Sequence, residues 1–187
     1  MTDVHFLDMQ AAVGVTKHIG GYEATGELLS LCHVANAREV LDAGCGIGVG
    51  PVNIARKFPC HVAGIDISAK MIEWSRLRAR EAGVGDRIEF HAADVLDLPF
   101  DNDRFDAVIC ESVLAFVKDK QRAIRELLRV TKPGGFIGLN EAYWITQPPP
   151  DMLERVKAAL GPTIITLEEW MSLWETSGLV DRIVRTR

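Results

Sequence analysis

Four glycines at alternate positions are the residues of this chain best suited to hold a ligand. They are Gly44, Gly46, Gly48 and Gly50, and they follow a short apolar run that ends in Asp42. Glycine lets the backbone turn sharply out of a strand, and the missing Cβ lets a ligand approach the main chain closely. The stretch therefore predicts a nucleotide-type binding loop between a strand and a helix.

Two common nucleotide motifs do not fit this loop. The GxGxxG fingerprint of dinucleotide-binding proteins requires a third glycine at position 49 or 51, where the chain has Val49 and Pro51. A phosphate-cradling P-loop ends in Gly-Lys-Ser or Gly-Lys-Thr, and no lysine stands near these glycines. Both observations argue against a nicotinamide or flavin dinucleotide and against a P-loop.

The glycine loop is the first of five ordered sequence blocks. The others read GIDIS at 64–68, ADV at 93–95, FDAVI at 105–109 and LLRVTKPGG at 127–135. In this order and spacing, from about position 40 to 140, the chain resembles the class I S-adenosylmethionine-dependent methyltransferases. The resemblance is closest to the small-molecule branch, of the ubiquinone-biosynthesis and sterol type. It implies S-adenosyl-L-methionine as cofactor and S-adenosyl-L-homocysteine as product.

The resemblance assigns parts of the cofactor to particular blocks. The methionine portion would lie along the main chain of 44–48, with Asp42 orienting the loop. Asp66 would accept hydrogen bonds from both ribose hydroxyls, and an ionised acceptor roughly doubles the strength of such a bond. Asp94 would accept from the adenine amine. The expected cofactor-binding residues are Asp42, Gly44, Cys45, Gly46, Gly48, Asp66, Ile67, Met71, Asp94, Val95 and Glu111.

The remaining members of this set have narrower expected roles. Ile67 and Met71 would pack on the faces of the adenine, and the backbone of Val95 would donate to its ring. The backbone at Cys110 and Glu111 would face the methionine amine.

The reaction implied is displacement of a methyl group from a sulfonium centre. The methyl is already electrophilic, so the main task of the protein is to align a nucleophile, and alignment can lower a barrier by about 7–11 kcal/mol. A base is needed only where the acceptor must lose a proton. Candidate bases or acceptor-orienting groups are His18, Glu111, Glu141 and Tyr143, and no metal ligand is expected.

Strand and helix patterns alternate through the middle of the chain. Strands are expected at 39–42, 61–66, 87–91, 105–110 and 136–140, and helices at 23–33, 50–58, 69–82, 119–130, 151–160 and 167–177. Five β-then-α alternations predict an α/β fold with three layers, a doubly wound and mostly parallel sheet of Rossmann-like type. Such sheets bind ligands at the carboxyl ends of their strands.

A single domain of 187 residues is expected, with three parts. Residues 1–38 form a helical lead-in or lid, in which the turn 18–22 could face the ligand. Residues 39–142 form the cofactor-binding core. Residues 143–178 contain aromatics, a proline run and helices, where this family usually builds its acceptor pocket.

The carboxyl-terminal stretch departs from the family pattern. The family's sheet normally closes with a sixth strand and an antiparallel seventh, and only residues 179–187 could form the sixth. An exposed sheet edge invites pairing with another chain. Either the chain is truncated, or a shortened member forms a homodimer through that edge.

Composition limits the partners and the compartment. The net charge is −5, and the Lys and Arg residues are scattered along the chain, which disfavours binding to nucleic acid. The sequence contains no run of 18 apolar residues, so no membrane span is expected. The first ten residues do not resemble a secretory signal, so a cytoplasmic location is expected. Cys32, Cys45, Cys60 and Cys110 show no zinc or disulfide spacing and are expected to be free core thiols.

Two other interpretations remain open at this point. The position after the fourth strand lacks the Asn/Asp-Pro-Pro-Tyr pattern of amino-group methyltransferases acting on nucleic acids and protein glutamine, which favours a small-molecule acceptor. One alternative is a non-catalytic S-adenosylmethionine-binding or assembly protein. The other is a dinucleotide oxidoreductase, despite the missing third glycine.

Overall fold

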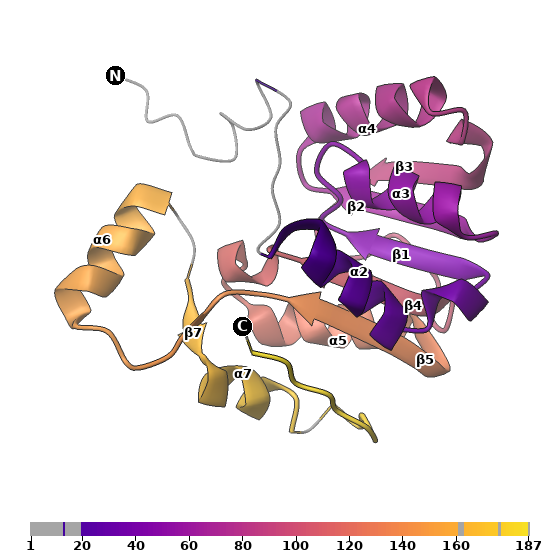
Figure 1. Cartoon of the computed structure of the whole chain (residues 1–187). Helices are drawn as coiled ribbons and strands as arrows, with labels where there is room; N and C mark the ends of the chain where they lie inside the picture. Colours follow the sequence, from indigo (N-terminus) through magenta and orange to yellow (C-terminus); the bar gives the residue numbers. More distant parts are fainter. Residues whose placement is uncertain (1–12, 14–19, 161–162, 176, 187) are drawn as a thin grey trace.

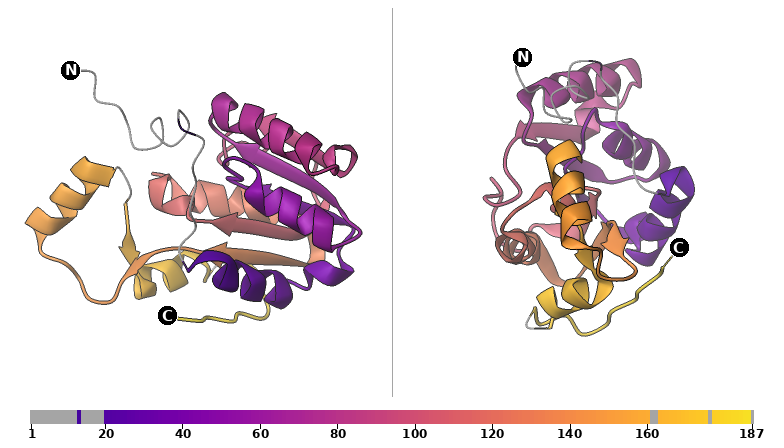
Figure 2. Two further views of the ribbon diagram at one scale, coloured as in Figure 1. Left: turned by 45° about the horizontal axis from the view of Figure 1, so that its top comes forward. Right: turned by 90° about the vertical axis from the view of Figure 1, so that its left-hand side faces the viewer.

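The fold is a parallel sheet with helices on both faces (Figures 1 and 2). A computed structural model describes residues 13, 20–160, 163–175 and 177–186. The strands of the main sheet are β1 (Glu39–Ala43), β2 (His61–Asp66), β3 (Ile88–Ala92), β4 (Phe105–Glu111) and β5 (Thr131–Asn140). The helices are α2 (Gly21–Leu31), α3 (Val49–Lys57), α4 (Ala69–Glu81), α5 (Lys120–Val130), α6 (Pro150–Leu160) and α7 (Leu167–Leu173).

The strands lie in the order β3-β2-β1-β4-β5 and every neighbouring pair is parallel. From β1 the chain continues to β2 on one side, and β4 later pairs with β1 on the other. The topological switch point therefore lies between the carboxyl ends of β1 and β4. The doubly wound Rossmann-like fold is confirmed, and the glycine loop follows the strand at its switch point.

Alternate residues of the strands face two separate cores. Val40, Val62 and Ile109 pack with apolar residues of α2, α3 and α4. Leu41 and Ile65 pack with α5, α7 and the connection between β3 and β4. Because both faces are covered, β1 and β4 are buried almost throughout, as in parallel sheets generally.

Side-chain caps begin the two helices α4 and α5. The Ser68 hydroxyl accepts from the backbone N–H of Met71 at 3.4 Å and caps α4. Asp119 precedes α5 and accepts from the backbone N–H of Arg122 at 2.9 Å. Each cap satisfies a backbone donor that has no partner within its helix.

The connection from β3 to β4 is a loop, and the sequence predicted no helix there. Residues 93–104 contain no helix. The buried apolar side chains of this loop, Val95, Leu98 and Phe100, join the core on the α5 face.

Several boundaries differ from expectation. Strand β5 begins at Thr131, because Thr131 pairs with Phe105 ahead of a register shift, and the KPGG stretch lies inside the strand. Helix α2 begins at Gly21 and takes in Tyr22, and α7 ends at Leu173. Two short strands that the sequence did not indicate, β6 (Tyr143–Trp144) and β7 (Ile165–Thr166), pair in parallel.

The expected sixth strand at 179–187 is wrong for the part that the structure describes. Residues 179–186 contain no strand, and Val180, Ile183 and Val184 are exposed there. In the described residues β5 pairs with β4 alone, so it forms one edge of the sheet. No helix among the described residues is long and apolar enough to cross a membrane.

Candidate functional site: the glycine loop at the carboxyl edge of the sheet

The glycine loop adopts a backbone that only glycine accepts easily. Gly44, Gly46 and Gly48 have φ angles of 90°, 53° and 79°, all in the left-handed region. A Cβ on Gly44 would lie 2.1 Å from Cγ2 of Val113, and one on Gly48 would lie 2.8 Å from Cα of Ser75. The glycines are thus required both by conformation and by close neighbours.

Hydrogen bonds from β2 and α4 hold this loop in place. The backbone N–H groups of Gly44 and Cys45 both donate to the Ile65 carbonyl, at 2.8 and 2.7 Å. The Ser75 hydroxyl donates to the Gly46 carbonyl at 2.8 Å, and Arg78 Nε donates to the Ile47 carbonyl at 3.0 Å. These bonds fix the backbone of the loop from within the fold, which lowers the entropy cost of binding a ligand.

Asp66 lies beside the loop as predicted from its place after β2. Its Oδ2 accepts from the backbone N–H of Gly46 at 3.0 Å, and its Oδ1 accepts from that of Ser68 at 2.9 Å. Burial raises the pKa of Asp66, and these two hydrogen bonds oppose the shift. An ionised carboxylate has about four lone-pair sites, so each oxygen can accept a second hydrogen bond.

Asp42 is the most deeply buried acid of the site. Its side chain is 5% exposed, and a Cβ on Gly50 would lie 2.2 Å from its Oδ2. Burial, and then the negative charges of Glu111 and Asp66, raise the pKa of Asp42 to about 8. The structure thus brings three carboxyl groups together around the glycine loop, and a positively charged ligand there would favour the ionised form of Asp42.

Glu111 ends β4 and contacts two elements. Both of its carboxylate oxygens lie within hydrogen-bond distance of the Thr25 hydroxyl of α2, at 3.0 and 3.1 Å. Asn140 Nδ2 donates to Glu111 Oε1 at 3.0 Å. These contacts place α2 against the carboxyl ends of β4 and β5, so the lead-in helix borders the site.

Glu141 has a role at the backbone after β4. Its carboxylate accepts from the N–H groups of Val113, Leu114 and Ala115, at 2.8, 2.7 and 3.3 Å, where η3 (Leu114–Phe116) begins. Burial raises the pKa of Glu141 to about 7, against the effect of these hydrogen bonds. Val113 in turn packs over Gly44. Both carboxylate oxygens of Glu141 thus bind the backbone of this segment. A catalytic role for Glu141 stays a prediction.

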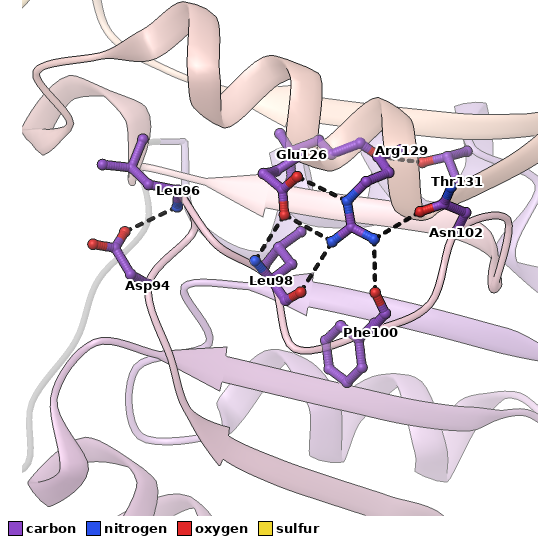
Figure 3. Close-up of polar contacts among 9 residues, drawn as sticks. Asp94, Leu96, Leu98, Phe100, Asn102, Glu126, Arg129 and Thr131 are labelled. Carbon is purple, nitrogen blue, oxygen red and sulfur yellow. Dashed lines mark hydrogen bonds and ion pairs between the residues drawn. The ribbon is translucent and has the colours of Figure 1, made fainter.

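Asp94 lies in the β3–β4 connection, which Figure 3 shows in detail. Its Oδ1 accepts from the backbone N–H of Leu96 at 2.9 Å, and the neighbouring Val95 is buried. Further along, Arg129 and Glu126 of α5 bond to the backbone of Leu98. The loop expected to contact the adenine is therefore attached to the helix behind it.

The other predicted residues differ in accessibility. Ile67 is 69% exposed and free to contact a ligand, whereas Met71 is 5% exposed and packs with Ile47 beneath the loop. Tyr143 is half-buried in β6, and Tyr22 is exposed on α2. His18 lies outside the described residues. The four cysteines are free and buried, as predicted.

Two cavities adjoin the carboxyl end of β5. One of about 340 Å³ lies between α2 and residues 139–145. The other, of about 410 Å³, lies along residues 143–149 and Met152. Both include Tyr143 and Ile145. The region expected to form an acceptor pocket thus does border space for a small molecule.

Several residues that build the site were missed from the sequence. Ser75, Arg78 and Thr25 act through contacts between elements distant in the chain, which no local pattern indicates. Ser112 has a positive φ of 59°, and such backbone often occurs near functional sites. Arg129 lies in the block at 127–135 that contributes to the family resemblance, but the pattern of that block does not indicate its partners.

Comparison with known proteins identifies the family. A family model described as a methyltransferase domain matches residues 41–139, more than half of the 187 residues. The chain is 34% identical over 119 residues to methyltransferase GfsG of Streptomyces halstedii, a match covering 64% of this chain and 43% of that protein. The chain belongs to the class I S-adenosylmethionine-dependent methyltransferase family.

Solved structures agree on the fold. Phosphoethanolamine N-methyltransferase 2 of Haemonchus contortus, in complex with S-adenosyl-L-methionine, has a TM-score of 0.79 at 21% identity, covering 88% of this chain and 38% of that chain. The cyclase SpnF has a TM-score of 0.69 at 28% identity, covering 83% of this chain and 57% of that one. The chain spans less than two thirds of each of these three proteins.

Gly48→Ala tests whether the loop needs glycine for close packing as well as for conformation. The left-handed backbone alone costs about 1–2 kcal/mol, and overpacking against Ser75 adds about 1–3 kcal/mol. We expect a larger loss in the free energy of unfolding than for Gly83→Ala, whose φ is 69° but whose Cβ would meet no atom within 4 Å. Urea denaturation of both variants measures this, and equal losses would show that the contact with Ser75 is unimportant.

Proposed function

We propose that this protein transfers the methyl group of S-adenosyl-L-methionine to a small organic acceptor. The observation that carries the proposal is the preformed glycine loop with Asp42, Asp66 and Glu111 around it. A sulfonium cation with a charged amine would stabilise the ionised forms of these carboxyl groups, whereas the phosphates of a dinucleotide would be repelled by them.

The residues of the loop have distinct tasks in this proposal. The main chain of 44–48 accommodates the methionine portion, and Glu111 lies near its amine. Asp66 accepts from the two ribose hydroxyls with the lone pairs that Gly46 and Ser68 leave free. Asp94 accepts from the adenine amine, and exposed Ile67 covers one face of the ring.

The protein promotes transfer chiefly by alignment. When bound, the cofactor supplies an electrophilic methyl: a lone pair of the acceptor attacks its carbon, the carbon–sulfur bond breaks, and its electrons return to sulfur. The chain contributes a fixed position for the methionine portion and a cavity for the acceptor. Glu111, Glu141 and Tyr143 are the described candidates for orienting the acceptor or removing a proton, and His18 remains a further candidate.

We place the acceptor in the 340 Å³ cavity beside α2. Its walls include apolar side chains of α2 and the polar residues Asn140, Glu141 and Tyr143. This volume lies within the range of small-molecule sites, about 300–1,000 Å³. Asn140 also bonds to Glu111, so the cavity borders the site at the end of β4.

A second candidate is a cofactor-binding protein that does not transfer methyl groups. SpnF has a similar fold and is named as a cyclase, not as a methyltransferase. A protein with this fold can therefore have another role, which supports the second candidate. Fold alone does not determine reaction.

Incubation with methyl-labelled S-adenosyl-L-methionine and a pool of small metabolites distinguishes the two candidates. We expect label to appear in a small molecule. Tight cofactor binding without transfer to any member of a broad pool would contradict catalysis.

Asp66→Ala should weaken S-adenosyl-L-homocysteine binding more than tenfold, while the same change at the exposed Asp86 should not. An unchanged affinity for the Asp66 variant would remove Asp66 from the ribose site.

We further propose a homodimer through the free edge of β5. Among the described residues β5 is the last strand of the sheet, and Phe136 on β5 is 40% exposed. Light scattering during size-exclusion chromatography should give a mass near twice 20.6 kDa, and a concentration-independent monomer would contradict this.

The four free thiols suit a reducing compartment, so we propose a cytoplasmic location, which cell fractionation can test.

A further inference from the structure

The β3–β4 connection depends on one arginine for much of its order. Residues 93–104 have no helix of their own, so their backbone polar groups need partners elsewhere. Arg129 Nη2 donates to the Leu98 carbonyl at 2.9 Å, and Nη1 donates to the Phe100 carbonyl at 2.7 Å and to Asn102 Oδ1 at 3.0 Å (Figure 3). One guanidinium thus joins three positions of the loop.

Glu126 completes the arrangement one turn earlier on α5. It accepts from Arg129 Nε and Nη2 at 2.8 and 2.7 Å, and its Oε2 also accepts from the backbone N–H of Leu98 at 2.8 Å. All five guanidinium N–H donors of Arg129 are therefore used. The hydrogen bond from Arg129 lowers the pKa of Glu126, so the pair stays charged at neutral pH. We call Arg129 and Glu126 the loop clamp.

The clamp lies directly after the residues expected to contact the adenine. Asp94 bonds to the N–H of Leu96, two residues before the clamped Leu98. Val95 and Leu98 are buried in the core below. With its backbone tied on one side and its apolar side chains buried on the other, the loop leaves Asp94 little freedom to move.

We propose that Arg129 is a positioning residue that aligns Asp94 and the Val95 backbone with the edge of the adenine, and so sets selectivity for that base. This inference rests on the proposed function. Arg129 uses its donors on Glu126 and on the loop, so it would act through Asp94 and not by touching the cofactor. A lysine cannot replace it, because an ammonium has three donors and lacks the planar fork that reaches Glu126 and the loop carbonyls together.

Selectivity for the base separates a positioning role from a purely structural one. The probes are S-adenosyl-L-homocysteine and S-inosyl-L-homocysteine, in which an oxygen replaces the adenine amine. Calorimetry should show the wild-type protein binding the adenosyl compound at least about tenfold more tightly, because the inosyl oxygen would face the Asp94 carboxylate. In Arg129→Gln and Arg129→Lys this ratio should fall at least about threefold.

A double-mutant cycle tests whether Arg129 acts through Asp94. Asp94→Ala should remove most of the selectivity, and adding Arg129→Gln to it should change the ratio little further, since coupled residues are not additive. Arg125→Gln is the matched control, because Arg125 lies exposed on the same helix, and it should keep the wild-type ratio. Urea denaturation of each variant reports stability separately.

The outcomes divide clearly. Variants of Arg129 that are less stable but keep the wild-type ratio would overturn the positioning role and leave the proposed function intact. Effects of Arg129 and Asp94 that simply add would overturn it as well. If the wild-type protein bound neither probe, the proposed function itself would fail. If Arg129→Gln does not fold, Arg129→Lys provides the same comparison.

Discussion

The structure depends on keeping a left-handed glycine loop fixed beside three carboxyl groups. Gly44, Gly46 and Gly48 turn the chain out of β1 at the topological switch point, where the strand order of the sheet reverses. Asp66 from β2 and Ser75 from α4 form hydrogen bonds with this loop and fix its conformation. Burying acids so close together is costly unless they are protonated or meet a cation. The raised pKa of Asp42 expresses this cost.

Other parts of the fold support that arrangement from both sides. Glu141 holds the start of η3, whose Val113 packs over Gly44. On the other side, the loop clamp attaches the β3–β4 connection to α5. Helix α2 borders the site through Thr25, and the cavity beside it leaves room for a small acceptor. The site is therefore built from segments that each bond to a different part of the sheet.

The sequence predicted the parts of this site that depend on local pattern. The glycine loop after β1 and the acid at the end of β2 both follow from the immediate chain, and the structure brings them together. The contacts of Thr25 with Glu111 and of Arg129 with Leu98 join residues 86 and 31 positions apart, and no local rule identifies them. The loop after β3 was expected from the sequence, but the tertiary bonds from α5 that hold it were not.

At the carboxyl-terminal end the sequence was less informative. Residues 179–186 have the apolar character of a strand, but strands form only where a neighbour supplies backbone partners, and there the described chain stays extended and unpaired. The strands β6 and β7 show the reverse case. Each has only two residues, and each supplies backbone partners to the other.

The central claim is that the acids around the loop receive a cation. Calorimetric titration with S-adenosyl-L-methionine at pH 7, in two buffers of different ionisation enthalpy, tests it directly. With a pKa of about 8, Asp42 is mostly protonated at that pH, and a bound cation lowers the pKa, so binding should release protons and the two heats should differ. Asp42→Asn should reduce that difference, and NAD should not bind. Binding of NAD without binding of S-adenosyl-L-methionine, or equal heats in both buffers, would contradict the account.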